Sequence, residues 1–585
     1  MVKIKSPIVR EIEYSSSSLV NLKSQLKSSE HKNDIKFLFD YPVVYIVNDE
    51  KNKQFSVYVG ETANIIRRTS QHLTDDIKKE NRDDWRDFAT SSTTKMFIIG
   101  HNHFNKSLTL DIENRLMLYL SSVDIVSSIQ NRRGNPQNKY FTSDELDSIF
   151  SKIWRLLRKS NKHLFPVESI VRNSAIFKAS PFHKLTEEQI EAKNTIINKI
   201  SASISKNQDG ILILVKGEAG AGKTVLMSSL VDDLLNSDDI SFIKDNNFIN
   251  IVVNNDHQLK VYKEIERKLD WNSGSSLEVA NKPTQFLNAL KKNAIKAGVV
   301  IVDEGHLLLT AKNQSYLGGN HLKDLLAQSK VVVLVYDDKQ IMSKSQIWTD
   351  NTFLELEHEA NLEGNLIELR NQMRIKANPE TVNWIRTIID DCEIKKLTKD
   401  KQYDIRIFDS PLKLQKAIKL KNKDQKLGIS RLVATYDWPF VEEKKKVEKI
   451  KDSKWFVEID DWKAPWNQQL KPTKKEEAKL SWIEQSQTIN EIGSTFTVQG
   501  FDLNYVGVII GPSVKYRNGK VIYDISESKN KGAVQNRKLA NGEKANYGER
   551  LLRNELNVLL TRGVNGLYIY AVDEELREAL NKAIK

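Results

Sequence analysis

Cysteine is almost absent from this chain of 585 residues. The single one, Cys392, cannot form an internal disulfide, and one thiolate cannot supply the ligands of a structural zinc site. An isolated thiol is typical of a reducing compartment. No run approaches the ~20 continuous apolar residues that a membrane span needs, and the start, MVKIKSPIVREIEY, lacks the apolar core of a signal peptide. We therefore expect a cytoplasmic protein without a membrane segment.

Proline and glycine are also sparse, and the excess of one sign of charge is small for a chain of this length. The chain has 12 Pro and 24 Gly, with 39% hydrophobic and 28% charged side chains. These values exclude collagen-like, low-complexity and wholly disordered chains, and the length suggests about four structural units. The 89 Lys and Arg against 77 Asp and Glu leave a net charge of +12. That surplus permits an anionic partner without proving one.

The hydrophobic pattern predicts an α/β protein with a small N-terminal block and a larger parallel-sheet region. Runs such as ILILVKG, VVIVDEG and YVGVIIG are typical of strands buried on both faces of a parallel sheet. The segment SKIWRLLRKSNKHLF has five Lys or Arg and no Asp or Glu, which suits a solvated helical face or a nucleic-acid contact. The expected divisions are a lead-in over 1–37, an α/β domain over 38–150, a basic helical linker over 151–182, one lobe over 183–360 and a second over 361–585, with a Lys- and Trp-rich insertion at about 435–490.

A phosphate-binding loop is the clearest motif. The sequence GEAGAGKT, from Gly217 to Thr224, follows the strand ILILVK and opens the helix VLMSSLVDDLL, the order that a P-loop requires. Gly217, Gly220 and Gly222 would let backbone N–H groups turn toward phosphates, and the helix N-terminus adds positive potential. Lys223 would reach the β- and γ-phosphates, and the hydroxyl of Thr224 would hold Mg²⁺.

An acidic pair ends the strand VVIVD. Asp303 and Glu304 suit a Walker B site, with Asp303 directed to the magnesium shell and Glu304 polarising the attacking water. An isolated Asp-Glu pair is usually a strand cap. The P-loop upstream favours the functional interpretation.

Residues from about 183 to 580 resemble the superfamily 1 helicases, and among them the Schlafen-like DNA/RNA helicase domain of bacteria. The matching stretches are LTEEQ, GEAGAGKT, VDEGH, YDDKQ, LRNQMR, STFTVQGFD and NVLLTRG, in the order that the family uses. The resemblance implies two RecA-like lobes that bind ATP in their cleft and move along a nucleic-acid strand. It also implies that Gln499 and Gly500 couple ATP to that strand.

The same resemblance implies roles around the nucleotide. Gln189 would read the adenine, and Gln340 would sense the γ-phosphate. Arg374 and Arg562 would act as arginine fingers, because a guanidinium stays charged and forks around transition-state oxygens. On its own, TEEQ is equally a helix capping box, and Arg374 also suits a surface ion pair.

Residues 41–140 resemble the GIY-YIG endonucleases. The first motif reads VVY, with valines in place of the family's glycine and isoleucine, and the second reads YVG. The residues matched to the family's catalytic positions are Tyr45, Tyr58, Arg68, His72, Glu113 and Asn131. The resemblance implies a nuclease in which Arg68 binds the scissile phosphate. Tyr45 would be the general base or orient the attacking water, assisted by Tyr58 and His72.

The chemistry of these residues suits that assignment. Arg68 and His72, at positions i and i+4, project from one helix face and can meet one phosphate. Glu113 would be the single carboxylate that anchors a divalent metal, with water in the remaining positions. A phenol with an ordinary pKa near ~10 needs the metal or a cationic neighbour to act as a base. Taken singly, strand tyrosines are more often packing residues, and a lone helical Glu is usually solvated.

We therefore predict an ATP-driven helicase or translocase fused to an endonuclease, with ATP and Mg²⁺ or Mn²⁺ as cofactors. Nucleic acid is the expected partner, and both resemblances favour DNA over RNA. Bacterial chains that join two such parts resemble antiviral defence systems. Two alternatives keep the P-loop: an ATP-dependent remodeller whose N-terminal domain only binds nucleic acid, and a nucleotide-switched sensor of DNA ends that assembles partners.

Overall fold

The computed structural model of the chain describes residues 4–27, 32–79, 82–131, 140–218, 220–236, 249–271, 277–312, 316–348, 351–370, 372, 374–423, 428–442, 445–474, 476–539 and 542–584. They form two compact units. The first unit is Met1–Leu185 with Val261–Leu277, and the second is Thr186–Lys260 with Glu278–Lys585. Among the described residues, no helix combines the length and apolar character that crossing a bilayer requires.

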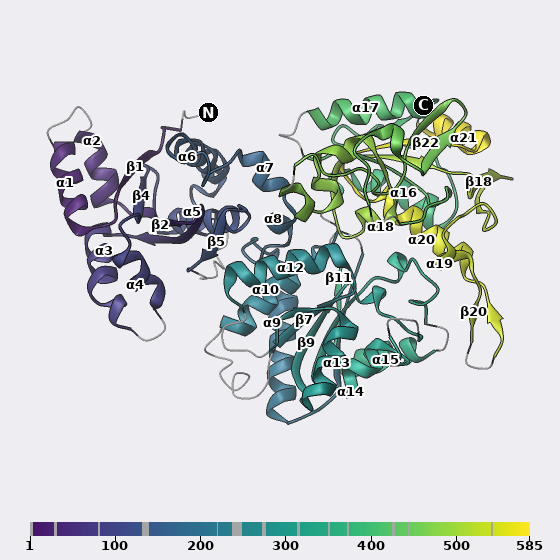
Figure 1. Cartoon of the computed structure of the whole chain (residues 1–585), viewed down its shortest axis with the longest axis horizontal. Helices are drawn as coiled ribbons and strands as arrows, with labels where there is room; N and C mark the ends of the chain where they lie inside the picture. The colour runs from purple at the N-terminus through teal and green to yellow at the C-terminus, as the bar shows by residue number, and fades with distance from the viewer. Residues whose placement is uncertain are drawn as a thin grey trace. The chain divides into compact units, whose positions relative to one another are not determined.

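The first unit is built on a five-stranded sheet of order β1-β4-β2-β3-β5 (Figure 1). Its strands are β1 (Ile8–Glu13), β2 (Val43–Lys51), β3 (Gln54–Thr62), β4 (Lys95–Gly100) and β5 (Val126–Ile129). A two-residue turn joins β2 to β3, and Asn52 and Lys53 both have positive φ, as the tight turns favoured by sheet twist require. The predicted lead-in supplies β1, which pairs antiparallel with β4 and so completes the sheet.

Helices cover both faces of this sheet. They are α1 (Ser16–Lys27), α2 (Lys32–Ile35), α3 (Ile65–Thr74), α4 (Asp83–Thr90), α5 (Lys106–Ser121), α6 (Leu146–Ser160), α7 (Glu168–Asn173) and α8 (Ala175–Ala179). On one face, Leu19 of α1, Ile65 of α3 and Trp85 of α4 share an apolar core with Tyr45 of β2. Helix α5 packs against β2, β3 and β5. The side chain of Tyr45 is therefore buried in this core.

The predicted basic linker is part of this packed unit. Helix α6 buries an apolar face that includes Phe150, Trp154 and Leu157, and it packs on β1 and α5. Its basic side chains lie on the other face, so the helix is amphipathic. The last part of α12 (Asp256–Leu269) also belongs to this unit: the buried ammonium of Lys268 donates to the carbonyls of Ser121 and Val123 at the end of α5.

The second unit begins with a six-stranded parallel sheet of order β11-β6-β10-β9-β7-β8. Its strands are β6 (Ile211–Gly217), β7 (Ile249–Val253), β8 (Ala280–Asn281), β9 (Ala297–Asp303), β10 (Ser329–Tyr336) and β11 (Leu366–Leu369). Its helices are α9 (Glu187–Ser205), α10 (Lys223–Asn236), α13 (Pro283–Asn293), α14 (His321–Ala327) and α15 (Thr352–Leu362). Strand β11 pairs with β6, so this lobe continues past the predicted boundary at residue 360.

A second parallel sheet, of order β12-β22-β17-β13-β16, follows in the same unit. Its strands are β12 (Asp404–Ile407), β13 (Arg431–Ala434), β16 (Ile492–Gly493), β17 (Leu503–Ile510) and β22 (Gly563–Ala571). Its main helices are α16 (Pro379–Asp390), α17 (Pro411–Lys423), α20 (Gly548–Leu560) and α21 (Glu574–Ile584). Two parallel sheets that follow a small α/β domain confirm the predicted fold class.

The Lys- and Trp-rich insertion contributes to the core of this second lobe. It contains the hairpin β14 (Phe456–Ile459) and β15 (Trp462–Pro465), and several single turns of 3₁₀ helix. Trp466 is fully buried in a cluster that also contains Leu432 of β13 and Ile509 of β17. Burial of such large apolar side chains explains why the segment holds to the lobe despite its weak periodicity.

Candidate active sites

The hairpin β2–β3 places two tyrosines side by side in the first unit. Tyr45 lies opposite Gly60 in the strand register, and the ring centroids of Tyr45 and Tyr58 are 6.0 Å apart. A side chain at position 60 would bring its Cβ to 2.5 Å from the phenol oxygen of Tyr45. Glycine is therefore required there to make room for the Tyr45 ring, which gives the glycine of the YVG motif a steric reason.

Helix α3 brings Arg68 and His72 to these phenols. The helix starts at its N-cap Asn64, whose side chain accepts a hydrogen bond from the backbone of Arg67. One turn apart, Arg68 and His72 share the face that meets the sheet, and His72 is fully buried. The hydroxyl of Tyr45 lies 2.8 Å from Nε2 of His72.

Burial and charge set the protonation states of this cluster. Burial raises the pKa of Tyr45 well above its ordinary value, and a hydrogen bond with Arg68 opposes that rise. Burial also lowers the pKa of His72 to about 3, helped by the charge of Arg68. At neutral pH the tyrosine is therefore protonated and the imidazole neutral, with one ring nitrogen whose lone pair can accept a hydrogen bond. The low pKa also makes this imidazole a weak base unless a nearby anion stabilises its protonated form.

Glu113 and Asn131 form the other half of the site. Helix α5, capped by Asn105, carries Glu113, whose side chain is buried. The amide nitrogen of Asn131 donates to Oε1 of Glu113 and to the carbonyl of Val59 on β3, both at 2.7 Å. The negative charge of Glu113 also acts on the phenol of Tyr58. The structure thus brings all six predicted nuclease residues into one region of the first unit.

The donor set around Glu113 suits a hard divalent cation. A carboxylate oxygen is the ligand type that Mg²⁺ and Mn²⁺ prefer, and Mg²⁺ commonly binds through one or two carboxylates with water in the other positions. In the ranges of the chain that the structure describes, no three His, Cys, Asp or Glu side chains gather in a metal-binding arrangement. A metal here would accordingly be held by Glu113, by water and by substrate oxygens.

Two neighbours of this cluster were not predicted from the motif. Asp76 lies four residues after His72, and its Oδ2 is 2.7 Å from Nδ1 of His72. Trp85 of α4 stacks on the His72 ring, with 3.5 Å between the ring centroids and 16° between the planes. The His-x-x-x-Asp spacing was a usable signal for Asp76, because residues four apart share a helical face. Nothing local marked Trp85.

The P-loop lies between β6 and α10 in the second unit. Gly220 and Gly222 have φ values of +95° and +73°, which only glycine adopts without strain. The ammonium of Lys223 donates to the carbonyls of Gly217 and Glu218 at 2.5 and 3.0 Å, and it lies 3.5 Å from the carboxylate of Asp337. These contacts hold the lysine above the loop, where it could exchange carbonyl partners for phosphate oxygens.

The two expected magnesium ligands converge on one amide. Nε2 of Gln258 donates to the hydroxyl of Thr224 at 3.1 Å and to Oδ2 of Asp303 at 2.7 Å. The oxygen atoms of both residues are therefore close enough to share a single cation, and oxygen donors are what Mg²⁺ prefers. Gln258 follows β7, which neighbours β9, so a search of the carboxyl ends of the parallel strands would have found it.

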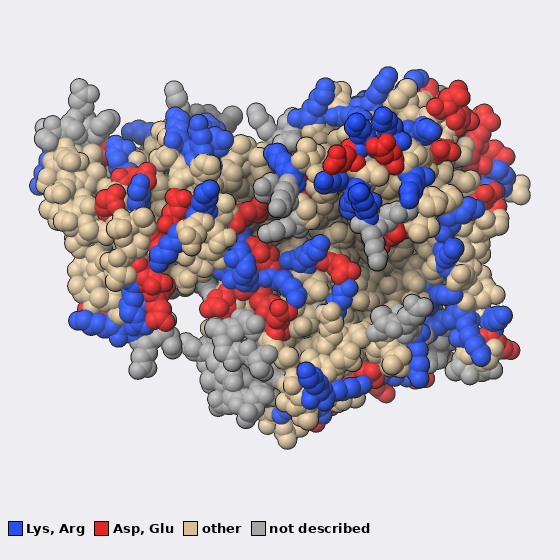
Figure 2. Space-filling model, viewed as in Figure 1, with Lys and Arg blue, Asp and Glu red and all other residues tan. Residues whose placement is uncertain are grey.

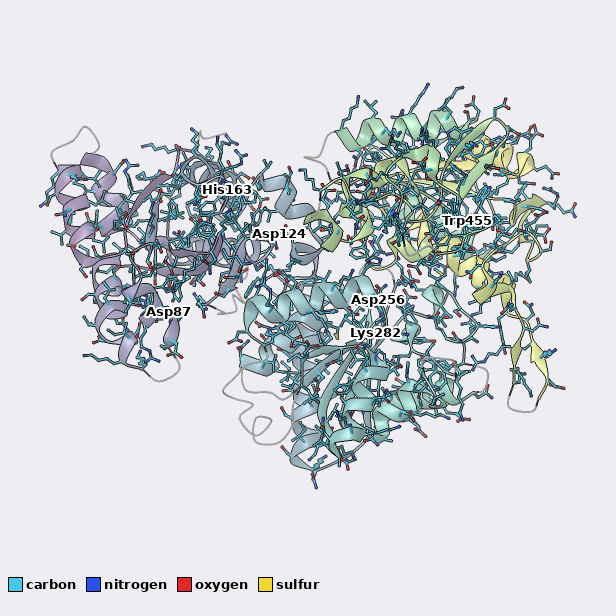
Figure 3. The ribbon with its side chains drawn as sticks, in the orientation of Figure 1. Asp87, Asp124, His163, Asp256, Lys282 and Trp455 are labelled. Atoms are coloured by element: carbon cyan, nitrogen blue, oxygen red, sulfur yellow. The ribbon has the colours of Figure 1, made fainter. Side chains whose placement is uncertain are left out.

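Gln258 is on the first part of α12, which starts beside the nucleotide site. Asp256 opens that helix and forms an ion pair with Lys282 at 2.6 Å (Figure 3). The backbone of Gln258 donates to the side chain of Asn255, which caps the helix start. Gln258 therefore lies in the first turn of α12, and its side-chain amide is held by Thr224 and Asp303.

Glu304 is held in an unusual backbone conformation. Its φ is +51°, a left-handed conformation that is uncommon for a residue with a long side chain. Burial raises the pKa of its carboxyl, and Nε2 of the buried His306 lies 3.3 Å from Oε2. Burial lowers the pKa of His306 to about 4, so this imidazole is neutral near pH 7.

Gln189 closes a helix capping box and also contacts the P-loop. It closes a capping box with Thr186 at the start of α9, through reciprocal bonds of 2.9 and 3.3 Å. Its amide nitrogen also donates to the carbonyls of Ala221 and Gly222 at 3.3 Å. Gln189 thus touches the P-loop, and adenine recognition stays a prediction.

The second lobe presents two arginines to this site. Arg562 is buried, and its guanidinium donates to Oε1 of Gln340 at 3.0 Å and to the carbonyl of Phe501 at 3.3 Å. Burial lowers its pKa to about 9, so Arg562 still carries its charge near neutral pH. Arg374 forms an ion pair with Asp502, yet its Nη1 is buried without a hydrogen-bond partner.

The loop contacts show how near the two lobes come to each other here. A Cβ placed on Gly220 of the P-loop would lie 2.7 Å from the Cβ of Arg374. Gln499 donates to the carbonyl of Gln340 at 3.1 Å and lies 3.2 Å from Nε2 of His306. A small pocket opens at this place, and its lining includes Glu218, Asp337, Lys339, Gln372, Arg386 and Thr561. The predicted nucleotide residues are therefore brought together around the P-loop.

Gly500 is predicted to resist substitution. Its φ is +86°, and an added Cβ would lie 2.9 Å from the side chain of Gln258. We expect Gly500→Ala to lower the free energy of unfolding by about 1–2 kcal/mol, because an L-residue is strained in the left-handed region. The control is Gly319→Ala, whose added Cβ meets nothing within 4 Å. Equal melting temperatures for the two variants would contradict the prediction.

Comparison with known proteins matches two parts of the chain. Residues 211–573 match the family model for the Schlafen group 3, DNA/RNA helicase domain, and residues 41–121 match the model for the GIY-YIG catalytic domain. An uncharacterized protein of Saccharomyces cerevisiae is 33% identical over 441 residues, which cover 68% of this chain and 91% of that protein. Among solved structures, a hypothetical ATP-dependent RNA helicase from Sulfolobus tokodaii matches with a TM-score of 0.21 and 13% identity, over 72% of this chain and all of that one.

Proposed function

We propose that this chain, which belongs to the Schlafen group 3 DNA/RNA helicase family and also carries a GIY-YIG catalytic domain, is a two-part enzyme. One part is an ATP-driven nucleic-acid motor, and the other is a metal-dependent endonuclease. The proposed motor is of the superfamily 1 type. The observation that supports cutting most directly is the assembly of Tyr45, Arg68 and His72 near the Glu113–Asn131 pair.

The proposed ATPase works by positioning and charge. Lys223 would exchange its carbonyl partners for the β- and γ-phosphates. Thr224 and Asp303 would hold Mg²⁺, which when bound offsets phosphate charge. Glu304 orients the attacking water. The guanidinium groups of Arg374 and Arg562 stabilise the charge that develops on the transferred phosphoryl group. Gln340, bonded to Arg562, would report the γ-phosphate to the second lobe.

The proposed nuclease hydrolyses a phosphodiester bond. Tyr45 takes a proton from the attacking water or orients it, with His72 as the acceptor behind the phenol. Arg68 binds the scissile phosphate, for which a fork of N–H donors is suited. Glu113 would hold a Mg²⁺ or Mn²⁺, which when bound stabilises charge on the leaving oxygen and on the phosphorane.

DNA is the proposed substrate, and the protein surface offers places for a nucleic-acid backbone. Figure 2 shows Lys and Arg side chains gathered over the region of α17, while acidic side chains gather near α21. Within α17, Lys416 and Lys423 are exposed. Phosphate contacts of this kind add affinity without sequence preference, and they weaken with salt. Competition between single-stranded DNA and RNA of one sequence, at two salt concentrations, would decide the preference.

A role in antiviral defence is part of the proposal. A motor joined to a nuclease suits the destruction of invading nucleic acid, which requires that cutting be restrained on the host's own. We expect cleavage to depend on ATP or on a nucleic-acid structure. Free nicking of any DNA with metal alone would argue against such restraint.

The test is nicking of supercoiled plasmid by the full chain, with Mg²⁺, Mn²⁺ or chelator, and with or without ATP. We expect metal-dependent cleavage that Arg68→Ala lowers about 10²-fold, because a phosphate-binding donor is lost. The control Arg67→Ala removes the neighbouring exposed arginine of the same helix and should cut normally. ATP hydrolysis without cleavage under any condition would instead favour a remodeller whose first domain only binds nucleic acid.

A further inference from the structure

Asp76 is a buried carboxylate placed directly behind the proposed nuclease site. It begins a short 3₁₀ turn after α3, and its side chain is 2% exposed. Its Oδ2 lies 2.7 Å from Nδ1 of His72, and its Oδ1 accepts from the ammonium of Lys79 at 2.6 Å. The GIY-YIG motif residues do not include it.

The hydrogen bonds fix which ring nitrogen of His72 carries the proton. Burial tends to raise the pKa of Asp76, but its hydrogen bonds with Lys79 and His72 hold that pKa below its ordinary value, so Asp76 is ionised near neutral pH. An ionised carboxylate only accepts, so Nδ1 must be the donor to Asp76. In a neutral imidazole the other nitrogen then has a free lone pair. That atom, Nε2, faces the hydroxyl of Tyr45 at 2.8 Å. Asp76 therefore accepts a hydrogen bond from Nδ1 of His72, and Nε2 of His72 accepts one from the hydroxyl of Tyr45.

The surroundings explain why His72 needs a carboxylate. The ring is covered by Trp85, and the charges of Arg68 and Arg82 both disfavour the imidazolium. Tyr45 from β2 and Tyr58 from β3 face it without carrying charge at neutral pH. Asp76 alone among these groups favours the protonated ring, through its hydrogen bond and its charge. Proton transfer to His72 would be costlier without it.

We propose that Asp76 is a positioning residue of the nuclease, which orients His72 and stabilises the proton that His72 takes from Tyr45. This inference rests on the proposed nuclease function. In the attack step, water gives a proton to Oη of Tyr45 while the proton of Tyr45 passes to Nε2 of His72. The water oxygen bonds to phosphorus, the bond from phosphorus to the leaving oxygen breaks, and that oxygen takes a proton from solvent. His72 later returns its proton to solvent.

Cleavage by Asp76→Asn across pH 6 to 9 tests this role in the full chain. We expect the rate near pH 7 to fall about 10²-fold, the usual share of an assisted proton transfer. The deficit should shrink as pH rises, because hydroxide can then act as the nucleophile itself, and its attack needs no proton transfer through Tyr45 and His72. Asp76→Glu should restore part of the rate. Asp75→Asn is the matched control, since it removes the adjacent but exposed carboxylate.

A second measurement does not depend on cutting. Nitrogen NMR of the full chain labelled at its 10 histidines, with His72→Gln to assign the signal, reports the tautomer. We expect the Nδ1–H form in the wild type and a loss of its dominance in Asp76→Asn. A wild-type Nε2–H form would overturn the relay.

The cleavage rates distinguish a failure of the proposed role of Asp76 from a failure of the proposed nuclease function. A cleavage rate for Asp76→Asn within twofold of wild type overturns the inference while leaving the nuclease intact. A uniform loss at every pH, without rescue by Asp76→Glu, also overturns it, because an anchor for the turn would behave so. If the wild type never cuts, or if Glu113→Gln cuts as fast as wild type, the proposed nuclease function fails first.

Discussion

Glu113→Gln is expected to reduce cleavage of supercoiled plasmid at least about 10³-fold, since loss of the metal removes several kcal/mol of transition-state stabilisation. The substitution keeps the size of the side chain. Its amide oxygen can still accept the hydrogen bond from Asn131, which spans Glu113 and the carbonyl of Val59. The change therefore removes the negative charge with little cost to packing, and a neutral amide binds divalent cations poorly.

The control for this prediction lies on the same helix. Asp111→Asn removes another buried carboxylate, which Tyr140 holds by a hydrogen bond of 2.6 Å. Two residues along an α-helix point in clearly different directions, so Asp111 faces away from the Glu113 position. We expect Asp111→Asn to cut within a few fold of wild type. Equal losses in both variants, or metal-dependent cutting by Glu113→Gln, would contradict the assignment of Glu113.

The sequence sufficed for the parts of the fold that local pattern controls. Buried parallel strands read as continuous apolar runs, so ILILVKG, VVIVDEG and YVGVIIG were identifiable as β6, β9 and β17. The P-loop was equally readable, because its glycines are required by backbone angles that only glycine adopts freely. Such features depend on neighbours in the chain.

Features that depend on tertiary contact were missed. Strand β1 has a partner, β4, that lies about ninety residues later in the register of Ile8 with Gly100. The insertion was recognised by its lysines, its tryptophans and its weak periodicity, none of which indicated that Trp466 and Trp482 are buried. The amino-acid composition of the insertion does not show which of its side chains point into the core and which point to solvent. It could not separate the buried aromatic face from the solvated basic one.

The candidate sites show the same division. Motif order supplied Tyr45, Arg68 and Glu113, yet it gave no reason to include Asp76 or Gln258. Both act on a motif residue through a hydrogen bond rather than by their place in a motif. Groups of this kind orient and tune the residues that touch substrate or metal, so they follow from helical spacing and from the ends of parallel strands rather than from motif order.

Lys223→Met is expected to lower ATP hydrolysis about 10³-fold, because the methionine retains the stem of the lysine but loses the charge that would contact the phosphates. The measurement is steady-state phosphate release with nucleic acid present. Lys216→Met is the matched control: Lys216 lies on β6 close to the loop, and its ammonium pairs with Glu357 at 2.5 Å. ATP hydrolysis should survive that change.

The same lysine also supports the folded site without nucleotide. Asp337 is buried, and although burial tends to raise its pKa, the charge of Lys223 contributes most to holding that pKa below its ordinary value. A carboxyl with a lowered folded-state pKa adds stability above its unfolded pKa, and this stability is lost as pH falls through the folded one. Lys223→Met should therefore melt at a lower temperature than wild type at pH 7, with the difference narrowing toward acid pH.

A Lys223→Met variant that hydrolyses ATP normally would remove the P-loop lysine from the proposed mechanism. One that loses hydrolysis and still nicks plasmid as the wild type does would show that cutting needs no motor.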